Sequence, residues 1–259
     1  MDLKSKIILI SGPTASGKSK AALKIAKKLN GEIINADSMQ VYKELKILTA
    51  RPSKTDLIKI DHHLYGFRSV KKEFSSGEWL KLAKKNIKKI RDKNKIPILV
   101  GGTGLYFKAL TDGLVKIPKI PISVRDKIRR MQNKLGQKKF YLKLLNNDPL
   151  VKNKIDPTDV QRSIRAYEVI KFTKKSVFSW YTKTKPSFKK DQFIKIYVDY
   201  PKEILINKIS KRVDQMMKNG AIQEVKDFLK LDLKSNSNIF KVIGIRAVSY
   251  THLTLPTKA

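Results

Sequence analysis

Two kinds of apolar pattern alternate along the first half of the chain. Short runs such as Ile7–Ile10 and Ile96–Val100 are typical of strands that are buried on both faces of a sheet. The stretch Ser76–Lys93 instead carries its apolar side chains at helical spacing, so it predicts a basic amphipathic helix. Strands that alternate with helices predict a parallel sheet with right-handed crossovers, and therefore an α/β fold.

Three strand-helix units are predicted in this region. The first has its strand at Ile7–Ile10 and its helix over Lys18–Leu29. The second begins with a short strand over Glu32–Asn35. The third joins the strand Ile96–Val100 to a helix over Leu105–Leu110 through a tight turn of two glycines and a threonine.

The pattern changes after residue 113. Pro118 and Pro121 interrupt regular structure, and the sequence up to about residue 190 is typical of helices without a strong strand. A strand returns at "FIKIYVDY", followed by a helix from Pro201 to Gly220 and another over Ala221–Leu231. We therefore expect a P-loop-like core made of residues 1–113 and 191–259, with a helical insertion domain over residues 114–190.

A phosphate-binding motif follows the first strand. The segment "GPTASGKS" has the form Gly12-x-x-x-x-Gly17-Lys18-Ser19, which is a P-loop. Between a buried strand and a helix, such a loop directs backbone N–H groups and the helix N-terminus at an anion. We expect Lys18 to reach the terminal phosphate and the Ser19 hydroxyl to ligate Mg²⁺, while the motif leaves open which phosphate compound is bound.

Asp37 follows the second strand at the carboxyl edge of the predicted sheet, where ligands bind in open α/β folds. A carboxylate beside a phosphate site repels the ligand unless it accepts a proton or holds a metal. A helix N-cap is the alternative role, because Asp is a preferred capping residue. The strand Ile96–Val100 ends in glycine and threonine and lacks the carboxylate with which P-loop kinases hold Mg²⁺, which counts against ATP chemistry.

The charge of the chain suggests a polyanionic partner. Its 259 residues include 57 Lys and Arg against 22 Asp and Glu, a net charge of +35, so nucleic acid is the first candidate. A compositional bias towards lysine is the alternative explanation. The sequence has no cysteine, no apolar signal segment at its N-terminus and no run long enough to span a bilayer, so we expect a cytoplasmic protein without a membrane partner.

Two further groups of residues have both a structural and a functional interpretation. Arg162 and Arg165 lie three positions apart on one helical face, which suits either a phosphate clamp or a solvated surface. The adjacent His62 and His63 do not have the spacing of zinc ligands, so a structural role or contact with a partner is favoured over metal binding.

Six motifs together resemble the tRNA dimethylallyltransferases, also called tRNA isopentenyltransferases or the IPP transferase family. They occur in the family's order and spacing, and "INADSMQVYK" after the P-loop is the most diagnostic. In chain order the motifs are "GPTASGKS", "GEIINADSMQVYK", "HHLYGF", "IPILVGGTGLYFKAL", "DPTDVQRSIRAYEVI" and "RVDQMMKNGAIQEV".

The resemblance implies that the dimethylallyl group of dimethylallyl diphosphate is transferred to N6 of the adenosine 3′-adjacent to the anticodon in tRNA. The P-loop would bind diphosphate as a leaving group, which suits the missing carboxylate because no water needs alignment on a γ-phosphate. Asp37 matches the family's proton acceptor. Thr14 and Arg212 match positions that stabilise the departing diphosphate, together with Lys18 and Mg²⁺ at Ser19.

The resemblance also implies the remaining site residues. The diphosphate would be bound by Gly12, Pro13, Thr14, Ala15, Ser16, Gly17, Lys18 and Ser19. The tRNA would be bound by Asp37, Ser38, Met39, Gln40, Thr103, Arg125, Gln161, Arg162, Ser163, Ile164 and Arg165. The insertion domain would grip the anticodon stem-loop, Mg²⁺ is the expected cofactor and a monomer is the expected state.

The sequence departs from the family pattern at two places. It reads "LKILTARP" where many members read "DIGTAKP" after the aspartate turn. Members also continue past "IGIR" into a basic C-terminal segment, whereas this chain ends in "VSYTHLTLPTKA". We interpret the residues after about Arg246 as atypical and as candidates for a non-native ending, which puts full tRNA affinity in question.

Two rival functions remain open at this point. A small-molecule or nucleoside kinase would share the P-loop and would turn over ATP without RNA. A non-catalytic RNA-binding protein could use the P-loop as a nucleotide switch, and it would bind RNA without consuming a prenyl donor.

Overall fold

The chain forms two compact units in the computed structural model, which describes all residues except 1–2, 183, 232, 234–237 and 251–259. Unit 1 comprises Met1–Thr111 and Phe188–Ala259, and unit 2 comprises Asp112–Ser187. The sequence-based domain boundaries at residues 114 and 190 stay a prediction.

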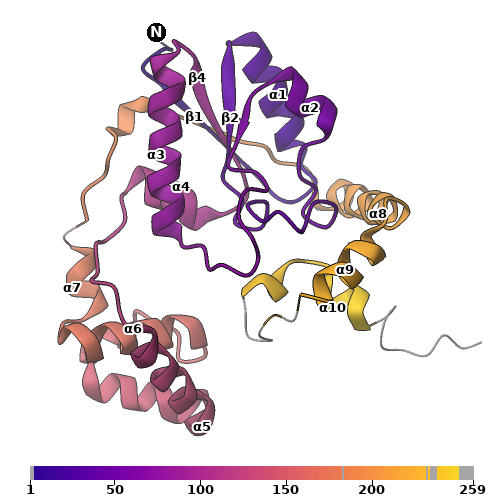
Figure 1. Ribbon diagram of the computed structural model, residues 1–259. Helices are drawn as coiled ribbons and strands as arrows, with labels where there is room; N and C mark the ends of the chain where they lie inside the picture. Colours follow the sequence, from indigo (N-terminus) through magenta and orange to yellow (C-terminus); the bar gives the residue numbers. More distant parts are fainter. Residues whose placement is uncertain (1–2, 183, 232, 234–237, 251–259) are drawn as a thin grey trace, which may run out of the picture. The chain divides into compact units, whose positions relative to one another are not determined.

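A five-stranded parallel sheet lies at the centre of unit 1, in the order β3-β2-β4-β1-β5 (Figure 1). The predicted α/β fold with an all-parallel sheet is confirmed. The strands are β1 (Ile7–Ser11), β2 (Gly31–Asn35), β3 (His62–His63), β4 (Ile96–Val100) and β5 (Phe193–Tyr197).

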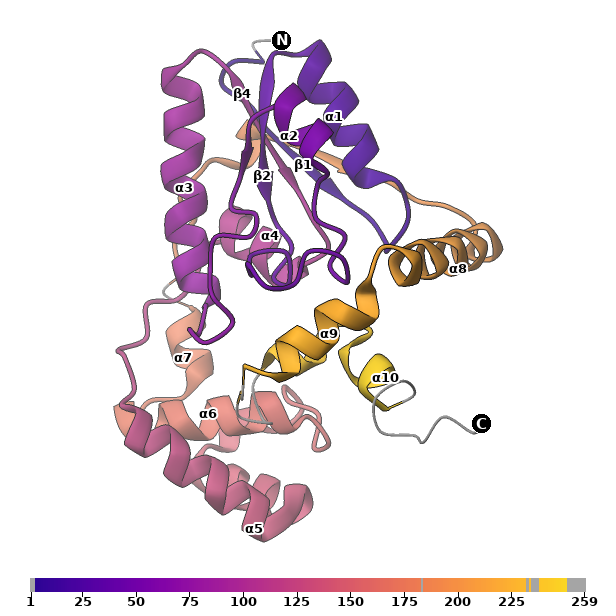
Figure 2. The same ribbon diagram turned by 45° about the vertical axis from the view of Figure 1, so that its right-hand side comes forward.

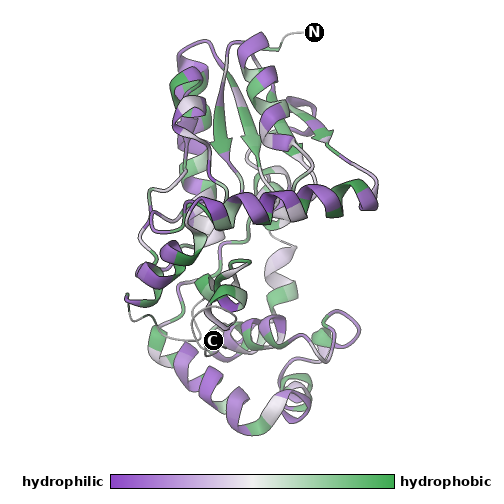
Figure 3. Ribbon diagram, turned by 90° about the vertical axis from the view of Figure 1, so that its right-hand side faces the viewer, coloured by the Kyte–Doolittle hydropathy of each residue, from purple (hydrophilic) through white to green (hydrophobic). Residues whose placement is uncertain are grey.

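Helices cover both faces of this sheet. Successive strand residues point to opposite sides, and apolar side chains on both sides pack against helices. Ile7 and Leu9 of β1 pack in one cluster with residues of α3 (Ser76–Asp92) and α4 (Gly104–Thr111). Ile8 and Ile10 pack in another with Ala22 and Ala26 of α1 (Lys18–Lys28). Figure 2 shows α1 and α3 on opposite sides of the sheet, and Figure 3 shows hydrophobic residues concentrated on its strands.

Helices from the C-terminal half of unit 1 pack against the loop that follows β2. Phe228 of α9 packs with Leu45, Val242 and Ile245 in a separate buried cluster, which ties this half to the loop after β2. The remaining elements of unit 1 are α2 (Lys54–Lys59), η2 (Lys190–Gln192), α8 (Lys202–Lys218), α9 (Ala221–Leu229), η3 (Asn238–Lys241) and α10 (Ile245–Val248).

Unit 2 is helical. Helix α5 (Ile122–Asn147) consists of two helical segments that meet at Gly136, where φ is 71° and ψ is 165°. Buried aromatic and aliphatic side chains hold α5 against α6, among them Phe140 and Tyr167, whose ring centroids are 5.2 Å apart. The other elements are η1 (Pro149–Val151), α6 (Val160–Thr173) and α7 (Val177–Tyr181).

Most of the atypical ending, residues 251–259, lies outside the described part of the chain. Among the described residues, no helix has both the length and the apolar character needed to cross a membrane.

Candidate active site

The P-loop connects β1 to α1 and presents unpaired donors. Gly17 adopts the left-handed conformation, with φ at 85°, and glycine does so without steric cost. Helix α1, which is described throughout, has no side-chain cap and no acidic residue in its first turn, so its first N–H groups remain available to an anion. Ser16 is 1% exposed, and its Oγ has no hydrogen-bond partner among the described residues.

The turn after β2 is fixed by the buried side chain of Asn35. Its Oδ1 accepts from the N–H of Asp37 at 2.8 Å, and its Nδ2 donates to the carbonyls of Asp37 at 2.9 Å and Leu64 at 3.0 Å. Asp37 Oδ1 in turn accepts from the N–H of Met39 at 2.9 Å. No helix begins there within the described residues 36–53, so the N-cap alternative for Asp37 does not apply.

The turn after β4 packs tightly against the Asp37 turn. The N–H of Ser38 donates to Thr103 Oγ1 at 2.9 Å, which links two of the predicted tRNA-binding residues. Gly101 lies so close to the other turn that an added Cβ would be 2.1 Å from the carbonyl carbon of Ala36. The two strand ends therefore place Asp37 in one defined position at the carboxyl edge of the sheet.

A cavity of about 70 Å³ lies where these loops meet. It brings together residues that are far apart in the sequence, including all three predicted catalytic residues. Its lining consists of Thr14, Lys18, Ser19, Asp37, Gln40, Thr49, Ala50, Val100, Gly101 and Arg212. Four lining residues were not predicted as site residues: Thr49, Ala50, Val100 and Gly101. The only signal for Thr49 and Ala50 was their place in the loop "LKILTARP" after the aspartate turn.

The cavity combines one carboxylate with two cations. Burial lowers the pKa of Lys18, Asp37 opposes that shift and Arg212 adds to it. Burial also lowers the pKa of Arg212, again opposed by Asp37. The Lys18 ammonium donates to the carbonyl of Pro13 at 2.9 Å. Asp37 itself forms no ion pair among the described residues.

The cavity offers Mg²⁺ few protein ligands, as is usual for P-loop sites, where phosphate oxygens supply further ligands. Across the described residues, no three His, Cys, Asp or Glu side chains cluster as a metal site. The exposed Ser19 lines the cavity beside Lys18. Mg²⁺ commonly takes few protein ligands and completes its shell with phosphate oxygens and water, so the Ser19 hydroxyl fits that arrangement.

The amino end of β2 carries a second carboxylate, which is fully committed. Glu32 is paired with Lys95 at 2.9 Å, Lys93 at 3.0 Å and His63 at 2.7 Å. Burial by itself would raise the pKa of Glu32, but hydrogen bonds from Lys95, His63 and Lys93 lower it to about 2. His63 therefore has a structural partner, while His62 Nδ1 lies 2.7 Å from the carbonyl oxygen of Ile60.

The predicted tRNA-binding residues of unit 2 lie at different depths. Gln161, Arg162 and Arg165 are exposed, whereas Ser163 is buried and accepts from Gln137 Nε2 at 3.1 Å. Ile164 is half-buried against the helical core. This face of α6 therefore presents Gln161 and the two arginines.

A buried glutamate holds two of the unit 2 arginines. Glu168 Oε2 lies 3.2 Å from Arg165 Nη1, and its Oε1 lies 3.6 Å from Arg125 Nε. Arg162 pairs with Asp159 at 3.5 Å, but its side chain remains 73% exposed. Arg162 is thus the most accessible of these predicted phosphate contacts.

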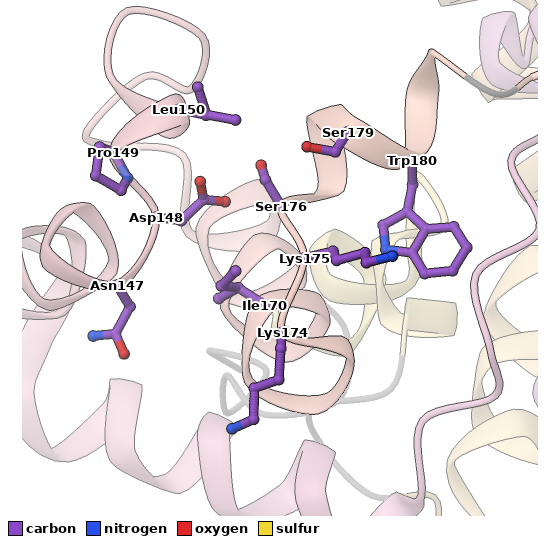
Figure 4. A pocket seen from close by; sticks show the side chains of 10 residues that line it. All are labelled: Asn147, Asp148, Pro149, Leu150, Ile170, Lys174, Lys175, Ser176, Ser179 and Trp180. Carbon is purple, nitrogen blue, oxygen red and sulfur yellow. The ribbon is translucent and has the colours of Figure 1, made fainter.

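Unit 2 also contains a larger cavity of about 550 Å³ (Figure 4). Asp148 lines it but is only 2% exposed, and its Oδ2 has no hydrogen-bond partner among the described residues. Since that oxygen is covered, it offers nothing to an incoming ligand. The other lining residues are Asn147, Pro149, Leu150, Ile170, Lys174, Lys175, Ser176, Ser179 and Trp180. The P-loop cavity therefore remains the candidate active site.

The parallel α/β fold, with a P-loop and Asp37 lining one cavity, places the chain in the class of P-loop-like α/β proteins. The sequence matches the IPP transferase family over residues 40–255. This chain belongs to the IPP transferase family. The resemblance that the motifs indicated is thereby confirmed.

Curated relatives and solved structures agree with this assignment. The chain is 60% identical to the tRNA dimethylallyltransferase of Pelagibacter ubique, covering 95% of this chain and 78% of that protein. It is 43% identical to the tRNA dimethylallyltransferase of Rickettsia massiliae, covering 93% of this chain and 67% of that one.

Two solved structures share the fold. One is a eukaryotic dimethylallyltransferase acting on tRNA, with a TM-score of 0.75 and 30% identity; the match covers 87% of this chain and 56% of that chain. The other is the tRNA isopentenylpyrophosphate transferase of Bacillus halodurans, with a TM-score of 0.62 and 31% identity, covering 95% of this chain and 77% of that chain.

Proposed function

We propose that this protein transfers the dimethylallyl group from dimethylallyl diphosphate to N6 of the adenosine 3′-adjacent to the anticodon in tRNA, with release of diphosphate. One observation carries the proposal: Asp37, free of ion pairs among the described residues, lines the same cavity as Lys18 and Arg212. Its membership of the IPP transferase family favours this reaction over the kinase alternative.

In the proposed reaction, N6 attacks the allylic C1 of the donor. The C1–O bond breaks, and its electron pair leaves with the diphosphate. The N6 proton passes to Asp37, because the amine is a poor nucleophile unless that proton is accepted as the C–N bond forms; such general-base catalysis contributes about 10²–10⁴-fold. Lys18, Arg212 and the Thr14 hydroxyl stabilise the negative charge that develops on the leaving group.

The P-loop supplies the diphosphate site in this proposal. Free backbone N–H groups of the loop and the start of α1 bind its oxygens, as the absence of a side-chain cap on α1, which is described throughout, supports. We propose Ser19 as the protein ligand of Mg²⁺. When bound, that ion would neutralise part of the diphosphate charge.

We further propose that unit 2 binds the anticodon stem-loop. The exposed Arg162 and Arg165 on α6 support this role, as does the net charge of +35. The target adenosine must leave its stack to reach the half-buried carboxylate of Asp37, as in other base-modifying enzymes. The contacts predicted for Ser38, Met39, Gln40 and Thr103 at the cavity belong to the same proposal.

The proposal also includes a monomer acting in the cytoplasm. All the groups proposed for catalysis come from one chain, so no second copy is needed to complete the cavity. The cysteine-free sequence is compatible with a reducing compartment.

A labelled donor tests the reaction directly. The protein is mixed with radiolabelled dimethylallyl diphosphate, Mg²⁺ and unmodified tRNA, and label in the RNA is measured after a single turnover. We expect label to enter this tRNA, and not a matched tRNA carrying guanosine at the target position. A parallel reaction with labelled ATP tests the kinase alternative.

The outcomes separate the three functions. Consumption of ATP without RNA would support the kinase. Binding of tRNA with no loss of donor would support a non-catalytic RNA-binding protein. Equal labelling of the two tRNAs would contradict the proposed target atom.

A further inference from the structure

The loop that follows the Asp37 turn forms one wall of the candidate active site. Thr49 and Ala50 line the cavity together with Lys18, Asp37 and Arg212. Ala50 has φ at 46°, a left-handed conformation that is uncommon for a residue with a Cβ. A wall with this backbone keeps its shape only if the surrounding contacts hold it in place.

A glutamate from a distant helix supplies those contacts. Glu224 on α9 accepts from three successive backbone N–H groups of the loop. Its Oε1 accepts from Lys46 at 2.7 Å and Ile47 at 2.8 Å, and its Oε2 accepts from Ile47 at 3.1 Å and Leu48 at 2.9 Å. Consecutive N–H groups that converge in this way form an anion site, and here the anion is part of the protein.

The same loop is tied to the Asp37 turn from its other side. Gln40 Nε2 donates to the carbonyl oxygens of Thr49 at 2.7 Å and Ala50 at 3.2 Å. Gln40 lies three positions after Asp37 and also lines the cavity. Hydrogen bonds therefore connect the loop on one side to α9 and on the other side to the turn that carries the proposed general base.

Apolar packing reinforces the connection to α9. Leu45 is buried in one cluster with Phe228, Ile239 and Val242, and Leu48 packs against that cluster. These contacts fix the distance between α9 and the loop, while the Glu224 carboxylate orients the loop's backbone. Packing alone would leave three N–H groups without their acceptor.

We infer that Glu224 is a positioning residue for prenyl transfer: it holds residues 45–50 as a wall of the active site and so fixes Gln40 and the Asp37 turn. The inference rests on the proposed function. Glu224 does not itself line the cavity, and it acts through the loop rather than on the reacting atoms.

The test compares Glu224→Gln with Glu203→Gln in the full chain. Gln keeps the size of the side chain but points an NH₂ group at backbone donors. Glu203 is an exposed glutamate in the first turn of α8, so its substitution removes the same charge without touching the loop. Two quantities are measured below the unfolding temperature: the single-turnover transfer rate with saturating donor and tRNA, and hydrogen exchange at the amides of residues 46–48.

We expect both quantities to change in Glu224→Gln and neither in Glu203→Gln. The three amides should exchange about tenfold faster or more, since a hydrogen bond to a charged group is worth at least that factor. The transfer rate should fall about tenfold or more with the loop misplaced. Glu224→Asp keeps the charge on a shorter side chain and should give intermediate values, and it replaces Glu224→Gln as the test if the latter does not fold.

Faster exchange at residues 46–48 with an unchanged transfer rate would overturn the inference, because the loop would then be loosened without effect on the reaction. Equal loss of rate in Glu203→Gln would overturn it as well, since the effect would come from charge alone. A wild-type chain that transfers no label would overturn the proposed function, and the positioning role would fall with it.

Discussion

Strand β2 has a carboxylate at each end, and the two are treated in opposite ways. At the amino end, the Glu32 side chain is fully buried and pairs with two lysines and a histidine. At the carboxyl end, Asp37 is half-buried, accepts one backbone hydrogen bond from Met39 and has no ion pair among the described residues. The nearby cations Lys18 and Arg212 line the same cavity as Asp37 but form no ion pair with it.

This difference separates Glu32, which has a structural role, from Asp37, for which we propose a catalytic role. A buried charge is tolerated only when partners replace the water it has lost, and Glu32 meets that condition with both oxygens. The position of Asp37 is fixed by Asn35 and backbone groups instead of by a cation. The rigid turn thus orients the carboxylate without neutralising it.

Asp37→Asn should have the largest effect. The substitution keeps the size of the side chain and the bond to Met39 but removes the proton acceptor. Single-turnover prenyl transfer should fall by about 10²–10⁴-fold, while the free energy of unfolding and donor binding stay nearly unchanged. Rapid-quench measurement with labelled donor gives the rate. Near-normal transfer by this variant would remove Asp37 from the mechanism and erase the contrast with Glu32.

Glu32→Gln should show the reverse result. It leaves two lysines and a histidine around a neutral side chain, and loss of one partner from a buried ion-pair cluster costs about 3 kcal/mol. The loss should be visible as a lower urea midpoint. The transfer rate of the folded fraction should match wild type, since Glu32 lies at the opposite end of β2 from the cavity. A fall in that rate at unchanged stability would show that the two carboxylates are not separate in role.

Acid should remove the contribution of Glu32 to the free energy of unfolding over a defined pH range. Its folded pKa, about 2, lies below the ordinary value of 4.5, so its stabilising effect is complete above 4.5 and is lost as the pH falls towards 2. The measurement is the difference in unfolding free energy between wild type and Glu32→Gln as a function of pH. A difference that does not shrink below pH 4 would contradict this assignment.

Lys18→Ala should give the smallest of these effects. It tests a cation of the Asp37 cavity instead of a carboxylate. It removes the ammonium that we propose as a contact of the diphosphate, and a charge-assisted contact of this kind is worth about 1.5–3 kcal/mol. Donor affinity, measured by calorimetry, should fall about tenfold or more, with tRNA affinity little changed. Equal loss of both ligands would indicate a fold defect, which circular dichroism would detect.

Local sequence signals located the chemistry, because the P-loop and Asp37 follow directly from strands with strong apolar runs. The two-residue strand β3 was beyond such signals: His62 and His63 have no alternation, and they form a strand only because Ile33 and Ile34 offer a neighbouring edge. By contrast, the two helical patterns "VRDKIRRMQNKL" and "KKFYLKLLNND" agree with α5, whose backbone leaves the helical conformation between them at Gly136.

Contacts across long stretches of sequence account for what was missed at the site. Glu224 reaches residues 46–48 only through the folded arrangement of α9, and nothing near it in the sequence marks it as part of the active site. The role of Glu32 was also invisible, since its partners come from β3 and from the segment between α3 and β4. A charged residue in a strand pattern is ambiguous until its neighbours are known.

The close approach at Gly101 has a consequence for how tolerant the protein is of genetic change. Any side chain there would collide with the backbone of Ala36 and displace the turn that carries Asp37. A saturation-mutagenesis screen for tRNA modification would therefore score Gly101 as intolerant as Asp37, although it donates, accepts and binds nothing through a side chain. Loss of function at this position would report steric exclusion, and a map of intolerant residues would overstate the number that take part in the reaction.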